Sequence, residues 1–151
     1  MKTEVKWALV AAVGLFLILI AEKLFGLQTA ESYDTWILVE IVLSLLLAIF
    51  VFWMLNREKR EIDLAGSMTW NQGFWAGALM TLIFIPLGTL LVYIFLKWVN
   101  PEAAQLLMVK GGSISGKDPV NNYLYLHLIN SLCGGLILAL IFPIFMKNRG
   151  N

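Results

Sequence analysis

Four long apolar runs, separated by short stretches that hold most of the charged residues, dominate this sequence. A helix needs about 20 apolar residues to cross the hydrocarbon core of a bilayer. The chain is 60% hydrophobic and 14% charged, which is far more apolar than a typical soluble domain. The runs therefore predict an all-α integral membrane protein with an antiparallel bundle of four helices. The expected transmembrane helices cover about 5–27, 36–55, 70–98 and 123–146.

The spans leave little chain for anything else, so residues 1–151 are expected to form a single transmembrane domain. The first run is short, and with Lys2 and Lys6 before it the run could also be a secretory signal peptide. A signal peptide usually ends in a small-x-small cleavage site, but Leu19 stands two residues before Ala21. We therefore expect a retained first span.

Basic residues indicate how the chain sits in the membrane. Seven of its eleven Lys and Arg residues lie on the side that holds both termini, including all three arginines. An excess of Lys and Arg in short loops marks the cytoplasmic side of a membrane protein. The sequence thus predicts that both termini are cytoplasmic.

The segments between the spans carry two helix-start signals. Thr69 and Gln72 have the spacing of a capping box, which predicts that the third helix begins at Trp70. In the long segment 99–122, Asn100 and then proline resemble a helix start, since proline suits the first helical position. Apolar residues on one face of that segment predict a short interfacial helix near 101–110. They are Ala103, Leu106 and Leu107.

Small residues recur every fourth position on the third and fourth spans, and such stripes allow membrane helices to approach closely. The stripes are Gly73, Gly77 and Thr81, and Ser131, Gly135 and Ala139. Counting from the midpoints of the antiparallel spans places Thr81 level with Ala139. It also places Thr89 level with Ser131. We expect the two stripes to pack together within one chain, and homodimer formation through one stripe is the alternative.

Ionisable and polar side chains near the outer boundary form the one candidate site in the sequence. They are Glu22, Lys23, Glu40, Lys97, His127 and Asn130. Charge inside a bilayer is costly and is usually paired or functional. The structural interpretation is a pair of Glu40 with Lys97 or with His127. The functional interpretation is a proton- or ligand-binding pocket that opens outward. One histidine with scattered carboxylates is a poor metal site, so no metal is predicted.

The segment 111–117 has the glycine and lysine spacing of a phosphate-binding loop, but Asp118 stands where that motif needs Ser or Thr. The expected interfacial helix before it also replaces the required strand. We therefore predict a flexible glycine loop and no nucleotide. The net charge of +1 also lacks the basic excess of nucleic-acid-binding proteins.

Several short segments together resemble a family of small bacterial integral membrane proteins known only as a domain of unknown function. The segments are 1–7, 22–23, 68–77, Pro86 and 100–101. The resemblance covers nearly the whole chain and implies a four-helix membrane protein of a bacterial cytoplasmic membrane. It implies no activity, cofactor or catalytic residue.

These features lead to two functional hypotheses. The first is a non-catalytic accessory or scaffold protein that binds other membrane components, because the chain is small and carries close-packing stripes. It would lie in the lipid bilayer with a membrane-protein partner or as a homo-oligomer. The alternative is a small transporter or channel-like protein with an outward-facing polar pocket. No Ser–His–Asp or Cys–His arrangement is plausible, so we predict no enzyme activity and no cofactor.

Overall fold

The computed structural model describes residues 2–111 and 118–146 and contains four long helices and one short helix. The long helices are α1 (Thr3–Leu24), α2 (Tyr33–Glu58), α3 (Trp70–Ile94) and α5 (Pro119–Met146), and the short helix is α4 (Pro101–Gly111). Short π-helical turns, η1 (Lys59–Asp63) and η2 (Phe95–Val99), extend α2 and α3. Each long helix is long and apolar enough to cross a bilayer. The predicted all-α fold is confirmed, and the chain is a multi-pass membrane protein.

The end of α1 differs from the prediction, which continued the first helix to Leu27. Gly26 adopts a positive φ of +68°, which is a left-handed conformation that glycine enters without a steric penalty. The Gly26 N–H donates to the Lys23 carbonyl, and the Leu27 N–H donates to the Glu22 carbonyl. These two bonds form a Schellman motif, so α1 stops at Leu24.

The start of α3 agrees with its sequence signal. The Thr69 hydroxyl accepts a hydrogen bond from the Gln72 N–H at 3.3 Å, and Gln72 Oε1 accepts one from the Thr69 N–H at 2.8 Å. This reciprocal pair is a capping box and satisfies two backbone donors that have no partner within the helix. The predicted start at Trp70 is confirmed.

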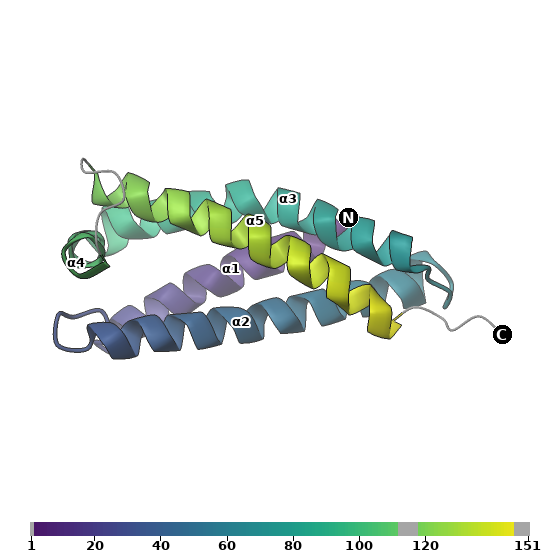
Figure 1. Ribbon diagram of the computed structural model, residues 1–151, viewed down its shortest axis with the longest axis horizontal. Coiled ribbons are helices and arrows are strands. Elements are labelled where there is room, and N and C mark those ends of the chain that lie inside the picture. Colours follow the sequence, from purple (N-terminus) through teal and green to yellow (C-terminus); the bar gives the residue numbers. More distant parts are fainter. Residues whose placement is uncertain (1, 112–117, 147–151) are drawn as a thin grey trace.

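The long helices run antiparallel along the chain, and α2 lies at one edge of the bundle (Figure 1). Helix α3 lies between α1 and α5 in the pattern of contacts, whereas α2 packs mainly on α1. Figure 1 shows α4 end-on, so this helix crosses one end of the bundle rather than running along it. We call this end the α4 end. The opposite end, where α1 and α3 begin, is called the charged end.

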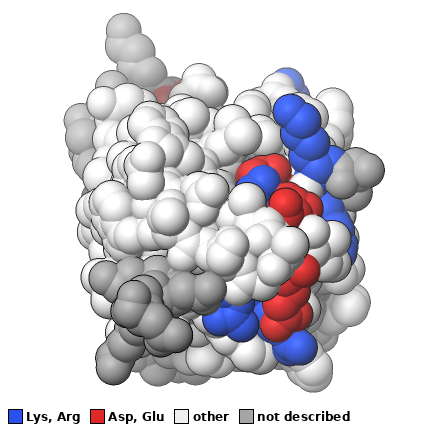
Figure 2. All heavy atoms as spheres, turned by 90° about the vertical axis from the view of Figure 1, so that its right-hand side faces the viewer, with Lys and Arg blue, Asp and Glu red and all other residues white. Residues whose placement is uncertain are grey.

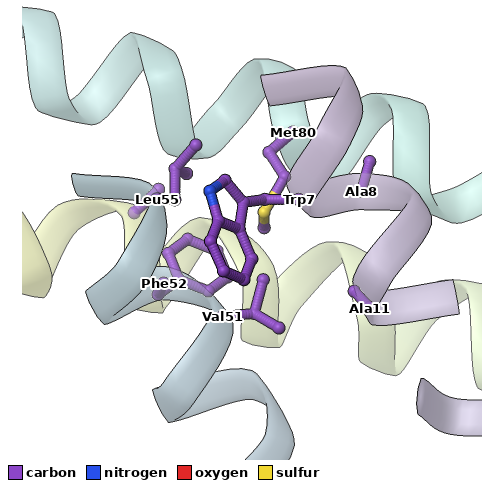
Figure 3. Packing of buried hydrophobic residues seen from close by; sticks show 8 residues of the cluster. Trp7, Ala8, Ala11, Val51, Phe52, Leu55 and Met80 are labelled. Carbon is purple, nitrogen blue, oxygen red and sulfur yellow. The ribbon is translucent and has the colours of Figure 1, made fainter. Parts of the chain in front are cut away.

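Two clusters of buried apolar side chains hold the helices together. Near the charged end, Trp7 of α1 packs against Val51, Phe52 and Leu55 of α2 and Met80 of α3 (Figure 3). Near the α4 end, a second cluster joins α1, α2, η2 and α4. Its largest members are Leu15, Leu19, Trp36, Phe95 and Leu96. Ala103 and Ala104 of α4 are buried in the second cluster, which fixes this helix across the bundle end.

The closest approach of two helices follows the small-residue stripes of α3 and α5. A Cβ atom added at Gly77 would lie 2.8 Å from the Ala139 Cβ, and one at Gly135 would lie 2.4 Å from the Thr81 Cγ2. At the charged end of this interface, a Cβ at Gly73 would lie 2.7 Å from the Pro143 Cβ. The stripes therefore face each other within one chain.

The register of the two stripes differs by about one helical turn from the predicted one. Thr81 faces Gly135 rather than Ala139, because the prediction assumed that the midpoints of the two apolar runs lie at equal depth. Continuing the observed register places Thr89 level with His127 rather than with Ser131. The shift follows from the fit of side chains, which counting along the runs does not include.

Candidate functional site

Charged side chains at the charged end pair with one another. Figure 2 shows basic and acidic side chains interleaved on this face. Lys6 of α1 pairs with Glu58 of α2 at 2.7 Å, and the Trp7 indole N–H donates to the same carboxylate at 2.9 Å. Lys59 pairs with Glu4 at 2.6 Å and with Asp63 at 2.9 Å. These contacts join the start of α1 to the end of α2. The role of this cluster of ion pairs is therefore structural, because it holds the two helix ends together.

A buried carboxylate lies at the α4 end, in the last turn of α1. Glu22 is 1% exposed, and its Oε2 accepts a hydrogen bond from the Trp36 indole N–H at 2.9 Å. The Gln28 amide approaches the same oxygen at 3.5 Å and also donates to the Leu19 carbonyl at 3.2 Å. Glu22 Oε1 is buried and has no hydrogen-bond partner. One oxygen of this carboxylate thus accepts hydrogen bonds from neutral donors, and the other oxygen accepts none.

The hydrogen-bond network around Glu22 extends to α4. The Asn100 side-chain amide donates to Gln28 Oε1 at 2.5 Å, and the Asn100 carbonyl accepts from the Ala103 N–H at the start of α4. Gln28 and Asn100 are both buried. The network therefore connects α1, the loop before α2, the first turn of α2 and the start of α4.

Three members of this network were not among the predicted site residues. In the sequence, Trp36 only begins the second apolar run and Asn100 only marks a helix start, and nothing distinguishes Gln28 from other loop residues. They meet Glu22 because the Schellman turn after α1 folds the loop back over the helix end. No sequence spacing encodes that contact.

Glu40 lies in the second turn of α2 and accepts a hydrogen bond from the Tyr123 hydroxyl of α5. This contact corrects the predicted pairs of Glu40 with Lys97 or His127. The Lys97 ammonium donates to the Tyr93 hydroxyl on its own helix at 2.6 Å and is exposed. Glu40 binds Tyr123 because of the way the helices are arranged: α2 packs against the face of α5 that carries Tyr123.

The other predicted site residues do not bond to Glu22 or Glu40. The Lys23 ammonium donates to the Val99 carbonyl at the end of η2. His127 packs its ring edge-on against Phe84, with centroids 6.4 Å apart, and its buried Nε2 has no partner. Asn130 is exposed. Of the six predicted residues, Glu22 and Glu40 are linked through α2, because Glu22 binds Trp36 and Glu40 lies one helical turn further along the same face.

The bond between Glu40 and Tyr123 leads to a stability prediction. A Tyr123→Phe variant should lower the free energy of unfolding by about 1 kcal/mol, because it removes one hydrogen bond between α2 and α5. Glu40→Gln should change it less, since the glutamine carbonyl still accepts from the hydroxyl. Thermal unfolding in detergent measures both variants. A larger loss for Glu40→Gln than for Tyr123→Phe would show that the carboxylate charge itself stabilises the fold.

Within the described residues, no group of three His, Cys, Asp or Glu side chains is placed to hold a metal ion. The segment with phosphate-loop spacing lies almost entirely outside the described residues, so the interpretation of that loop stays a prediction.

Comparison with known proteins adds a family match. A family described as "Protein of unknown function (DUF4199)" matches residues 6–148, which is nearly the whole chain. No curated protein and no solved structure matches the chain.

Proposed function

The chain belongs to the DUF4199 family, and we propose that it is a non-catalytic accessory or scaffold protein that binds another membrane protein. It would lie in a bacterial cytoplasmic membrane with both termini in the cytoplasm. The excess of Lys and Arg on the side of the charged end supports this orientation.

The observation that carries the proposal is the exposed side of α2. Large apolar side chains cover this side from the second turn of the helix almost to its end. They are Leu38, Ile41, Val42, Leu43, Leu45, Leu46, Ile49, Phe50 and Trp53. Because α2 lies at the edge of the bundle and packs mainly on α1, this side is open along most of the membrane thickness (Figure 1).

The polar side chains at both bundle ends support the same interpretation. Glu58 and Lys59 bind α1 at the charged end, and Glu40 and Trp36 bind neighbouring segments at the α4 end. Each bond attaches α2 to the rest of the chain. These bonds hold α2 in a fixed position at both of its ends. A second membrane helix can therefore pack along its exposed side by van der Waals contact.

Site-specific photocrosslinking in native membranes tests the proposal. A photoreactive residue at Leu45 or Leu46, which are 53% and 57% exposed, should yield a discrete protein adduct. Leu17 of α1 is equally open at 58% and is the matched control, at which only lipid adducts are expected. Mass spectrometry of the adduct identifies the partner. Lipid adducts alone at all three positions would overturn the proposal.

The second candidate function is a small transporter with an outward-facing polar pocket. The contact between Glu40 and Tyr123 favours it, because a carboxylate inside a membrane helix commonly marks an ion or substrate pathway. Flux into proteoliposomes separates the two candidates. A flux that disappears in Glu40→Gln, while thermal stability stays unchanged, would favour the transporter.

A further inference from the structure

We propose that Glu22 and Glu40 form the acidic half of a binding site for a small monovalent cation at the α4 end of the bundle. The cation is a proton or an alkali ion, both of which bind carboxylate oxygen. This inference is independent of the proposed function, since an accessory protein and a transporter could each contain such a site.

Glu22 carries a buried carboxylate oxygen, Oε1, that has no hydrogen-bond partner. A buried carboxylate is stable only if it is neutralised or fully hydrogen-bonded, and Oε1 has no donor. Trp36 occupies Oε2 and fixes the orientation of the carboxyl group. The site is therefore oriented before any ligand binds, and the free oxygen is its binding atom.

The described residues place no positively charged side chain against Glu22. Among residues 2–111 and 118–146, the ion pairs all lie at the charged end. Lys23 and Lys97, which lie at the α4 end, are directed elsewhere: Lys23 donates to the Val99 carbonyl and Lys97 to the Tyr93 hydroxyl. A buried glutamate is usually neutralised by a cation, as Glu4 is by Lys59. Glu22 has no such partner in the described chain.

Glu40 of α2 supplies the second carboxyl group of the site. Glu40 lies one helical turn after Trp36, the residue that binds Glu22, and so is on the same face of α2. Tyr123 of α5 donates to Glu40 and Tyr33 packs edge-on against Trp36, and both tyrosines are neutral phenols. His127 of α5 is half-buried, and its buried Nε2 bonds to neither glutamate. Two carboxylates without a cation repel each other, so the binding of one cation reduces this repulsion.

Burial limits the size of the ligand. Glu22 is 1% exposed and lies beneath Trp36 and Gln28, so a hydrated divalent ion or an organic cation would have to displace this network. Divalent ions also demand six or more oxygen ligands, and magnesium usually keeps several waters. A proton needs only one oxygen, and a dehydrated alkali ion is smaller than a hydrated divalent ion or an organic cation.

Labelling with dicyclohexylcarbodiimide tests the site in the full-length protein. This reagent is apolar and reacts with protonated carboxyl groups in apolar surroundings. We expect one adduct on Glu22, located by peptide mass spectrometry of the unmodified sequence, so that no variant has to fold. The adduct should be lost in Glu22→Gln. Absence of any adduct on Glu22 and Glu40 in the folded protein would overturn the proposal.

Two arms of this experiment identify the cation. Loss of labelling in sodium chloride at constant pH, relative to choline chloride at equal ionic strength, assigns an alkali ion. Loss of labelling only as the pH is raised assigns a proton. Labelling that neither sodium nor pH changes would contradict a cation site. Glu40→Gln should weaken the cation's hold on Glu22 by about tenfold, because it removes the second negative charge.

Matched controls come from glutamates elsewhere in the chain. Glu4→Gln removes a buried carboxylate that Lys59 already neutralises, and Glu31→Gln removes an exposed one in the loop before α2. Both variants should keep the full adduct on Glu22. Loss of the adduct in either control would indicate that labelling reports on general loosening of the fold rather than on this site.

Discussion

A Gly135→Leu variant is expected to lose the packing of α5 against α3 and to fall below the stability needed for a monodisperse preparation. Even a single Cβ atom at this position would lie 2.4 Å from the Thr81 Cγ2, so the two helices must separate. Overpacking of an interior usually costs about 1–3 kcal/mol, and a leucine at a helix contact should reach the upper part of that range. The melting temperature in detergent and size-exclusion profiles measure the effect.

The adjacent glycine gives the control. A Cβ atom at Gly134 meets nothing within 4 Å, so Gly134→Leu adds the same side chain one residue away, where its Cβ meets no neighbour. Gly134→Leu should melt close to the unmodified protein, since leucine also favours helix more than glycine does. Gly77→Leu should behave like Gly135→Leu, because its Cβ would lie 2.8 Å from the Ala139 Cβ. Equal melting of the Gly134 and Gly135 variants would refute the packing argument.

The second large effect is expected at the charged end. Lys59→Met should lower the free energy of unfolding by about 2 kcal/mol, because it leaves Glu4 buried without a cation. The Glu4 side chain is 7% exposed and that of Lys59 is 21% exposed, so water screens this pair only in part. Lys59 also binds Asp63, which lies nearer the surface and should contribute less. Thermal unfolding at neutral pH measures the loss.

A double variant separates the loss of the ion pair from other effects of Lys59→Met. Glu4→Gln combined with Lys59→Met removes both charges, and the double variant should recover at least half of the lost stability. Additive losses in the two single variants and the double variant would mean that the pair contributes nothing beyond its separate side chains. Lys6→Met serves as the comparison at a pair that is more exposed than Lys59 and Glu4, where Glu58 keeps its bond from Trp7 and a smaller loss is expected.

Local signals in the sequence predicted the helices well where the backbone alone decides. The capping box at Thr69 set the start of α3, because its bonds join residues three positions apart. The prediction of the end of α1 was wrong. Apolar residues continue past Gly26, but the helical backbone conformation ends before it, because Gly26 has a positive φ. Hydropathy reports the surroundings of a side chain, and it does not report φ angles.

Polar contacts between helices were much harder to predict. Glu40 was expected to pair with Lys97 or His127 by depth and charge, and it binds Tyr123 instead. Depth in a membrane follows from position along each helix, but partner choice needs the rotation and order of the helices. The same limit explains why Gln28 and Asn100 were missed around Glu22.

The sequence by itself determined the number of helices, their apolar character and the residues that allow close approach. These properties are local, because a span depends on the hydrophobicity of consecutive residues and a small stripe depends on spacing within one helix. Tertiary structure alone decided which helices are neighbours, the one-turn register of α3 against α5, and the isolation of Glu22 from every described cation. Those outcomes depend on how side chains from distant segments fit together, since each helix could present the same residues to several possible neighbours.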